Sequence, residues 1–181
     1  MPETREPREQ LILRMGTFIH ETLQKILQAR YEKLGYLYLP ETEVTIGEHV
    51  HGHCDALVIG SDGFVECQEY KTCSQSVFDG LSAPGQRHER QLQIYLEGLR
   101  SPTGRFLYIS RNDCRMKEYP IRKGGDVHKE IMGLIDIVDT ALANKVAPKP
   151  RPEWAVTAHC TAVCKFRHLC PAAKSKRVES I

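Results

Sequence analysis

The sequence lacks any long run of apolar residues, and no stretch approaches the roughly 20 residues that a membrane-spanning helix requires. It also shows no signal-peptide pattern, internal repeat or low-complexity block, which argues against a membrane, secreted or repeat protein. The sequence has almost no excess of either charge, since 25 Lys and Arg against 23 Asp and Glu leave a net charge of +2. Overall charge therefore does not indicate a nucleic-acid binder. A chain of 181 residues normally forms one domain with a sizeable core.

Seven cysteines are present, an odd number that argues against a disulfide framework in a chain without signs of secretion. We therefore expect a reducing, cytoplasmic location. Three of them, Cys160, Cys164 and Cys170, lie close together near the C-terminal end. Thiolates grouped in this way select an Fe–S cluster or zinc. Cys54 and Cys67 are instead expected to be small buried side chains in strands.

The expected elements follow the order helix, three strands, helix, two strands and helix, which indicates an α/β fold with a central mixed sheet flanked by helices. The helices are predicted at Pro7–Leu34, Gly85–Leu99 and Asp126–Ala143. The strands are predicted at Tyr36–Val50 (in part), Cys54–Ile59, Gly63–Lys71, Arg105–Ser110 and Met116–Arg122. The first helix carries an apolar stripe that is expected to be buried, formed by Leu11, Met15, Phe18, Ile19, Leu23, Ile26, Leu27 and Leu34. Residues 72–86, rich in Ser, Gly and Pro, are expected to form a mobile loop.

Asp55 in one expected strand, with Glu69 and Lys71 at the end of the next, is the most informative combination. A hairpin can bring Glu69 back beside Asp55, and Glu69 and Lys71 leave the same face because they are two residues apart. Carboxylate oxygens suit Mg²⁺ or Mn²⁺. A lysine beside such a metal can orient or deprotonate water, or stabilise developing negative charge. The alternative is a solvated face with a weak ion pair.

Two helical motifs flank this combination. His20 lies at the edge of the apolar stripe of the first helix, and histidine is a common metal ligand. Gly16, one turn earlier, costs about 1 kcal/mol relative to alanine inside a helix, which indicates close packing there. Gln91 and Tyr95 share one face of the second helix and could hold a lysine, a water or a phosphate. Taken singly, each is also explained as a boundary or surface residue.

In order, the segments Gly16-x-x-x-His20, Gly52-x-x-Asp55, Glu69-Tyr70-Lys71-Thr72 and Gln91-x-x-x-Tyr95 resemble the motifs of the RecB-like branch of the PD-(D/E)XK nuclease superfamily. The resemblance implies a restriction-endonuclease-like core over residues 1–147. It implies that His20, Asp55 and Glu69 bind Mg²⁺ or Mn²⁺ and that Lys71 is catalytic. It also implies that Gln91 and Tyr95 support the site and contact DNA.

Residues 148–181 resemble the C-terminal end of the iron–sulfur exonucleases of that branch, which include the CRISPR-associated exonuclease of the fourth Cas family and the AddB nuclease domain. The resemblance implies a cysteine-rich tail packed on the core, with the three clustered cysteines holding a 4Fe-4S cluster. No cysteine precedes Cys54 to serve as the usual fourth ligand. His159, His168 or Cys73 as that ligand, and zinc in place of iron, stay open.

The expected function is that of a metal-dependent deoxyribonuclease, and the resemblance implies an exonuclease acting on single-stranded DNA or DNA ends. The expected partners are DNA and proteins of DNA repair or of CRISPR adaptation in antiviral defence. One alternative is a catalytically weak DNA-binding or end-processing subunit with a structural Fe–S or zinc site. Another is a structural zinc protein without a nucleic-acid function. The presence of Asp55, Glu69 and Lys71 together favours the enzyme.

Overall fold

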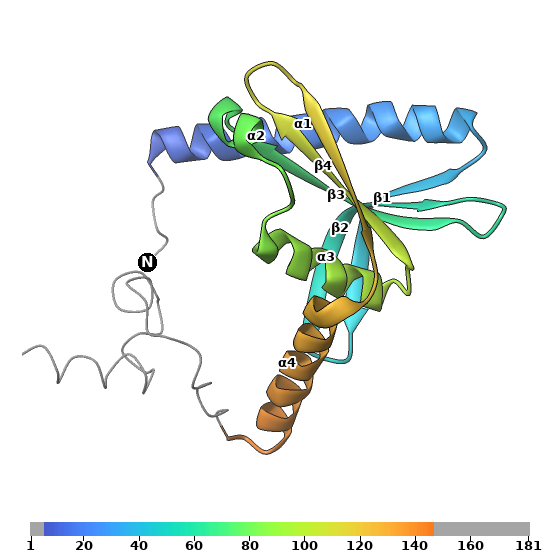
Figure 1. Cartoon of the computed structure of the whole chain (residues 1–181), viewed down its shortest axis with the longest axis vertical. Helices are drawn as coiled ribbons and strands as arrows, with labels where there is room; N and C mark the ends of the chain where they lie inside the picture. Colours follow the sequence, from blue (N-terminus) through green and yellow to red (C-terminus); the bar gives the residue numbers. More distant parts are fainter. Residues whose placement is uncertain (1–5, 147–181) are drawn as a thin grey trace, which may run out of the picture. The chain divides into compact units, whose positions relative to one another are not determined.

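The structure is a computed structural model, and it describes residues 6–146 of the chain (Figure 1). In chain order the elements are α1 (Pro7–Lys33), β1 (Leu37–Ile46), β2 (Val50–Ile59), β3 (Val65–Cys73), α2 (Gln75–Gly80), α3 (Gln86–Gly98), β4 (Thr103–Ser110), β5 (Met116–Arg122) and α4 (Gly125–Ala143). The chain divides into two compact units, the first ending at Ile135 and the second beginning at Asp136 within α4. The sheet and the first three helices belong to the first unit. Within residues 6–146, no helix is both long and apolar enough to cross a membrane.

The five strands form one sheet in the order β1-β2-β3-β4-β5. Neighbouring strands are antiparallel except β3 and β4, which are parallel and are joined through α2 and α3. Two parallel neighbours need a long crossover of this kind, whereas antiparallel neighbours need only a turn. The register of the parallel pair sets Glu69 opposite Phe106 and Lys71 opposite Tyr108. The prediction of a mixed sheet flanked by helices is confirmed.

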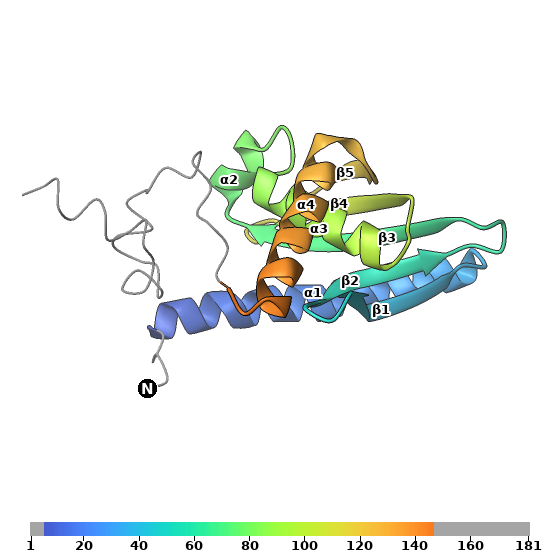
Figure 2. The same cartoon turned by 90° about the horizontal axis from the view of Figure 1, so that it is seen from below.

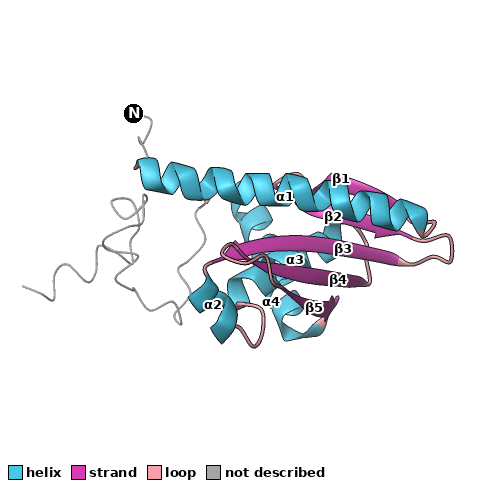
Figure 3. Ribbon diagram, turned by 90° about the horizontal axis from the view of Figure 1, so that it is seen from above, coloured by secondary structure: helices cyan, strands magenta, loops and turns pink. Residues whose placement is uncertain are grey.

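The sheet lies between α1 on one face and α3 on the other (Figures 2 and 3). On the α1 face, Ile19, Leu23, Leu27 and Tyr31 pack against a buried cluster of strand side chains. That cluster consists of Tyr38, Ala56, Val58, Tyr70, Leu107 and Ile109. Successive residues of a strand point to opposite faces, so β3 directs Tyr70 toward α1 and its neighbours Glu69 and Lys71 toward α3.

On the α3 face, Leu92 and Leu96 are fully buried against strand residues. They hold α3 over the middle of the sheet, because two leucines one turn apart form a continuous apolar stripe along the helix. Cys54 and Cys67 lie in the same cluster with no exposed surface, as predicted for small buried cysteines. The position of α3 matters for the site, since Gln91 is the residue next to Leu92.

The prediction for the first helix is correct in its position and wrong for part of its stripe. Leu11 and Met15 continue the spacing of the buried residues but are exposed, because α1 begins well beyond the ends of the strands (Figure 3). Phe18, Ile26 and Leu34 are exposed as well. Their side chains project from the helix away from the sheet, so they remain exposed although they are apolar.

The prediction of a loop over residues 72–86 is also wrong in part. Strand β3 continues to Cys73, and α2 begins directly afterwards. Ser74 caps α2, since its side chain accepts a hydrogen bond from the backbone nitrogen of Val77 at 3.5 Å. Phe78 is buried and anchors the short helix in the core. A six-residue helix is too short for its periodicity to be recognised from the sequence.

Candidate active site

The carboxylate of Asp55 lies where β2 and β3 separate. The pairing of these strands ends at Ala56 opposite Gln68. One residue further, Oδ2 of Asp55 accepts a hydrogen bond from the backbone N–H of Tyr70 at 2.5 Å. Its other oxygen, Oδ1, accepts from Nδ1 of His20 at 3.1 Å. Asp55 therefore satisfies a backbone donor that the strand pairing leaves free, and it links α1 to the sheet.

Lys71 lies at the centre of a chain of hydrogen bonds that joins β3 to α3. Its Nζ donates to Oε1 of Glu69 at 2.6 Å and to Oε1 of Gln91 at 3.0 Å. The amide of Gln91 in turn donates to the hydroxyl of Tyr95 at 2.9 Å. The structure thus brings Gln91 and Tyr95 together with Lys71. Lys71 keeps about a fifth of its side-chain surface exposed, so the ammonium remains accessible.

A glycine makes room for the helix that carries these groups, and it is Gly52 rather than Gly16. A Cβ atom added at Gly52 would lie 3.1 Å from a ring carbon of Tyr95. A Cβ atom at Gly16 would meet Thr72 at 3.5 Å, which is an ordinary contact. The expectation of close packing at Gly16 is therefore wrong. Close approach occurs instead in the Gly52-x-x-Asp55 segment, where β2 passes under the phenol.

The electrostatic state of the cluster reflects its burial. Burial, reinforced by the charge of Asp55, raises the pKa of Glu69 to about 7, although Lys71 opposes this shift. Burial lowers the pKa of His20, but the hydrogen bond and charge of Asp55 and the charge of Glu69 outweigh it, so the pKa of His20 is raised. Two carboxylates close enough to repel each other therefore lie beside two cationic or protonatable side chains.

Glu69 offers the clearest test of whether a metal ion suits this site. In residues 6–146, no group of three or more His, Cys, Asp and Glu side chains is arranged as a metal cage. His20 and Asp55 are hydrogen-bonded to each other, and Lys71 donates a hydrogen bond to one oxygen of Glu69. The second oxygen, Oε2, is buried and has no hydrogen-bond partner among the described residues. A divalent cation would satisfy this oxygen and reduce the repulsion between the carboxylates, so the donor set of one imidazole and two carboxylates fits Mg²⁺ or Mn²⁺.

One residue that supports the site was not foreseen. Gln24 lies one turn after His20 on α1 and is buried. Its amide donates to Oε1 of Glu41 at 2.6 Å and to the backbone oxygen of Asp55 at 3.0 Å. Gln24 thereby fixes the helix against the same strand residue that His20 contacts. The four-residue spacing was the available signal, but nothing in the sequence shows which strand faces it.

Glu66 lies outside the cluster, as expected from its opposite direction on β3. It bonds to Arg105 at 3.0 Å on the other face of the sheet. The predicted cluster ligands Cys160, Cys164 and Cys170 lie outside the described residues. The division between a core over 1–147 and a tail over 148–181 stays a prediction for the same reason.

Comparison with known proteins finds relatives only at the level of three-dimensional structure. No protein-family model matches the chain, and no curated protein matches its sequence. The crystal structure of SSO0001 is 26% identical, with a TM-score of 0.54, and the match covers 87% of this chain and 69% of that one. The alkaline exonuclease LHK-Exo from Laribacter hongkongensis is 15% identical, with a TM-score of 0.53, and the match covers 69% of this chain and 67% of that one. LHK-Exo in complex with dAMP matches at 15% identity and a TM-score of 0.51 over the same shares.

This chain shares the fold of LHK-Exo. The likeness rests on the mixed five-stranded sheet with its flanking helices, and it is a statement about the fold.

Proposed function

We propose that this protein is a metal-dependent deoxyribonuclease of the RecB-like type, acting as an exonuclease on single-stranded DNA or DNA ends. The observation that carries the proposal is the environment of Lys71, whose ammonium is held between Glu69 and Gln91 while the second oxygen of Glu69 is left without a partner. Buried polar atoms are normally hydrogen-bonded, so a bound cation would account for the unpaired carboxylate oxygen. The shared fold with an alkaline exonuclease supports the same class of reaction.

The side chains divide the work of phosphodiester hydrolysis among them. His20, Asp55 and Glu69 would hold Mg²⁺ or Mn²⁺, which supplies Lewis-acid polarisation of the phosphodiester. Lys71 donates to a phosphoryl oxygen and stabilises the negative charge that develops there. Gln91 accepts from Lys71 and keeps the ammonium directed into the site. In the reaction a water oxygen bonds to phosphorus and releases a proton to solvent, one P–O ester bond breaks, and the departing oxygen takes a proton from solvent.

The ligand in one structure of LHK-Exo is of the class that the proposed reaction would release. LHK-Exo has been crystallised with dAMP, a nucleoside monophosphate. An exonuclease that removes single nucleotides releases products of this class. For this chain, we propose that DNA ends enter beside the first turn of α3, where Arg87 can neutralise a phosphate.

The tail completes the proposal. Cys160, Cys164 and Cys170 would hold a 4Fe-4S cluster or zinc, and the fourth ligand stays open. In this arrangement the metal centre is structural, and the hydrolytic site is separate. The cellular partners would be proteins of DNA repair or CRISPR adaptation.

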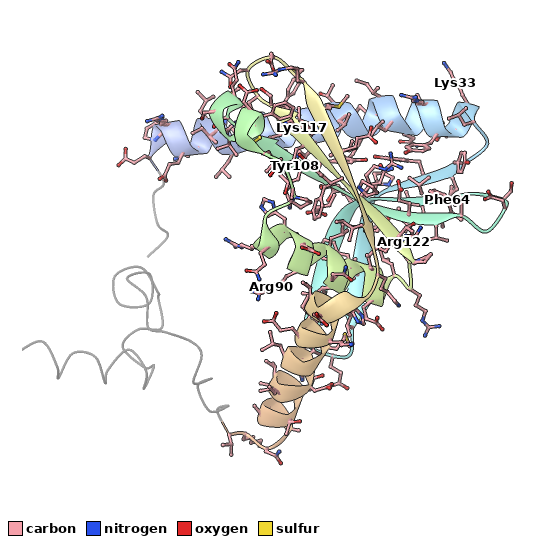
Figure 4. All side chains as sticks on the ribbon, in the orientation of Figure 1. Lys33, Phe64, Arg90, Tyr108, Lys117 and Arg122 are labelled. Atoms are coloured by element: carbon pink, nitrogen blue, oxygen red, sulfur yellow. The ribbon has the colours of Figure 1, made fainter. Side chains whose placement is uncertain are left out.

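The test is cleavage of end-labelled single-stranded DNA with Mn²⁺ by the wild type and by Lys71→Ala. The kcat of the variant should fall by about a hundredfold or more, because the ammonium of Lys71 stabilises the transition state. DNA affinity and the unfolding midpoint should change little. Lys33→Ala is a matched control, since Lys33 is exposed at the C-terminal end of α1 (Figure 4). DNA binding without cleavage by the wild type would instead favour the non-catalytic DNA-binding subunit, and near-wild-type cleavage by Lys71→Ala would refute the assignment of the lysine.

A further inference from the structure

A histidine that the cluster described above does not include lies beside it. His88 is in the first turn of α3 and precedes Gln91 by three residues, so the two side chains leave neighbouring positions of one helix face. Nδ1 of His88 lies 2.7 Å from the hydroxyl of Tyr108. Tyr108 is in turn the residue paired with Lys71 across the parallel strands β3 and β4. His88 therefore stands next to Lys71 above the same face of the sheet.

The hydrogen bond to Tyr108 determines which nitrogen of His88 carries the proton. Among residues 6–146, Nδ1 of His88 is the only acceptor within hydrogen-bond distance of the phenol proton of Tyr108. We therefore assign the phenol as the donor and Nδ1 of His88 as the acceptor, because the opposite arrangement would leave the phenol proton without an acceptor. In a neutral imidazole the proton must then lie on Nε2. Burial lowers the pKa of His88, and the charges of Lys71 and Arg87 lower it further, which favours this neutral form.

The Nε2–H group is left as a free donor. Within residues 6–146, Nε2 of His88 makes no hydrogen bond, although its ring packs against Phe106 and Tyr108 with centroids 6.4 and 5.8 Å away. The side chain is half-buried, so the ring is held by its packing while part of its surface remains exposed. Nearby Lys71 and Arg87 are cations that act on His88, and their charges beside an N–H donor favour an anion that accepts hydrogen bonds. A phosphate oxygen meets both requirements.

We propose that His88 contacts the DNA substrate directly, donating from Nε2 to a non-bridging oxygen of the phosphate next to the scissile one. The proposal rests on the proposed nuclease function and adds a substrate-binding residue to it. Tyr108 acts as a positioning residue, because it fixes the ring orientation and the tautomer of His88. A neutral donor suits this position, since another full positive charge would stand beside Lys71 and Arg87.

A purely structural role for His88 predicts a different result. If the pair of His88 and Tyr108 only fastens the start of α3 to β4, every change at His88 should lower stability, and DNA affinity should follow the folded fraction. Two substitutions separate these cases because each retains one nitrogen position of the imidazole. His88→Asn retains a polar atom near Nδ1 and loses the donor at Nε2. His88→Gln retains a donor near Nε2 and loses the group near Nδ1.

The experiment measures KM and kcat on end-labelled single-stranded DNA with Mn²⁺, together with thermal unfolding. His88→Asn should raise KM about tenfold with little change in kcat or unfolding midpoint, the cost of one hydrogen bond to a charged phosphate. His88→Gln should recover most of that loss. Tyr108→Phe should raise KM by a smaller factor, because the donor remains while its orientation loosens.

The salt dependence of binding distinguishes a neutral donor from a cation. It is measured as the Kd for the same DNA in a Lys71→Ala background, which prevents cleavage. His88→Asn should leave the slope of log Kd against log salt unchanged, since a neutral imidazole displaces no counterion. A slope reduced by about 0.7 would identify a protonated histidine and overturn the assignment. Equal KM values for wild type and His88→Asn would overturn it too, with the nuclease function intact, whereas a wild type that neither binds nor cleaves DNA would remove both proposals.

Discussion

At the scale of single residues, Glu69 places its two carboxylate oxygens in different environments. Oε1 accepts from Lys71, and Oε2 is buried without a partner in the described part of the chain. Burial and the charge of Asp55 raise the pKa of Glu69 to about 7, which shows that the free site disfavours its negative charge. Such a carboxylate is destabilised until a cation arrives, and this makes it a suitable ligand.

Replacing the proposed metal ligands one at a time tests the shared metal site. Asp55→Ala and Glu69→Ala should abolish calorimetrically detected Mn²⁺ binding, and His20→Ala should weaken it, because a hard cation depends most on the charged oxygens. Glu43→Ala is a matched control, since Glu43 is an exposed carboxylate on β1. Unchanged Mn²⁺ affinity in all three site variants would return His20 and both carboxylates to a structural role.

The stability of the protein should depend on pH through His88. Burial, Lys71 and Arg87 lower the pKa of His88 in the folded state below its ordinary value of 6.5. Between those two values the unfolded chain binds a proton that the folded chain does not, so stability decreases as the pH falls through 6.5. His88→Gln lacks this titration, and its stability relative to wild type should increase as the pH falls. Urea unfolding of both proteins from about pH 8 to about pH 5 measures the difference, and a constant difference would contradict the prediction.

At the scale of elements, α3 determines the geometry of the site by approaching the sheet closely. Leu92 and Leu96 bury one side of this helix, and Gln91 and Tyr95 then reach Lys71 and the strand at Gly52. The far end of α3 lies even closer to the sheet, because a Cβ atom added at Gly98 would lie 2.5 Å from Val44 and 3.1 Å from the backbone oxygen of Thr45.

Gly98→Ala should therefore destabilise the protein by about 1–3 kcal/mol, because the buried Val44 and the strand backbone cannot move aside. Gly133→Ala is the matched control in α4. A Cβ atom there meets nothing within 4 Å, and alanine should stabilise the helix by up to about 1 kcal/mol. Free energies of unfolding from urea titration give both values. Equal effects at the two positions would show that α3 can shift away from β1 without cost.

At the scale of the whole molecule, the proposed metal centre in the cysteine tail couples metal binding to folding. If Cys160, Cys164 and Cys170 hold a cluster, the energy of binding it also stabilises the fold. Replacing any one of them by Ser should lower metal content and thermal stability while leaving Mn²⁺ binding unchanged. Cys67→Ser should cost only packing, since Cys67 is buried in the core.

Metal analysis of anaerobically purified protein decides the kind of centre. Iron with sulfide supports a cluster, and stoichiometric zinc without iron supports a structural zinc site. Absence of both would refute ligation by the tail.

Much of the fold and of the candidate site was predictable because its signals are local. Periodicity placed three helices and most of the strands, and the spacing of Glu69 and Lys71 correctly put them on one strand face opposite to Glu66. The same reasoning put Gln91 and Tyr95 on one helix face. It failed for Leu11 and other residues of α1, since periodicity does not show where the sheet under a helix ends.

The sequence by itself determined which side chains share a face of an element, because the periods of strands and helices depend only on neighbouring residues. Tertiary structure alone decided which faces meet. Elements that are distant in the chain are joined by the contact of Gln24 with Asp55 and by the pairing of His88 with Tyr108. The burial of the unpartnered oxygen of Glu69 likewise depends on how distant elements pack. These contacts depend on how α1 and α3 pack on the sheet, and packing is a property of the whole fold.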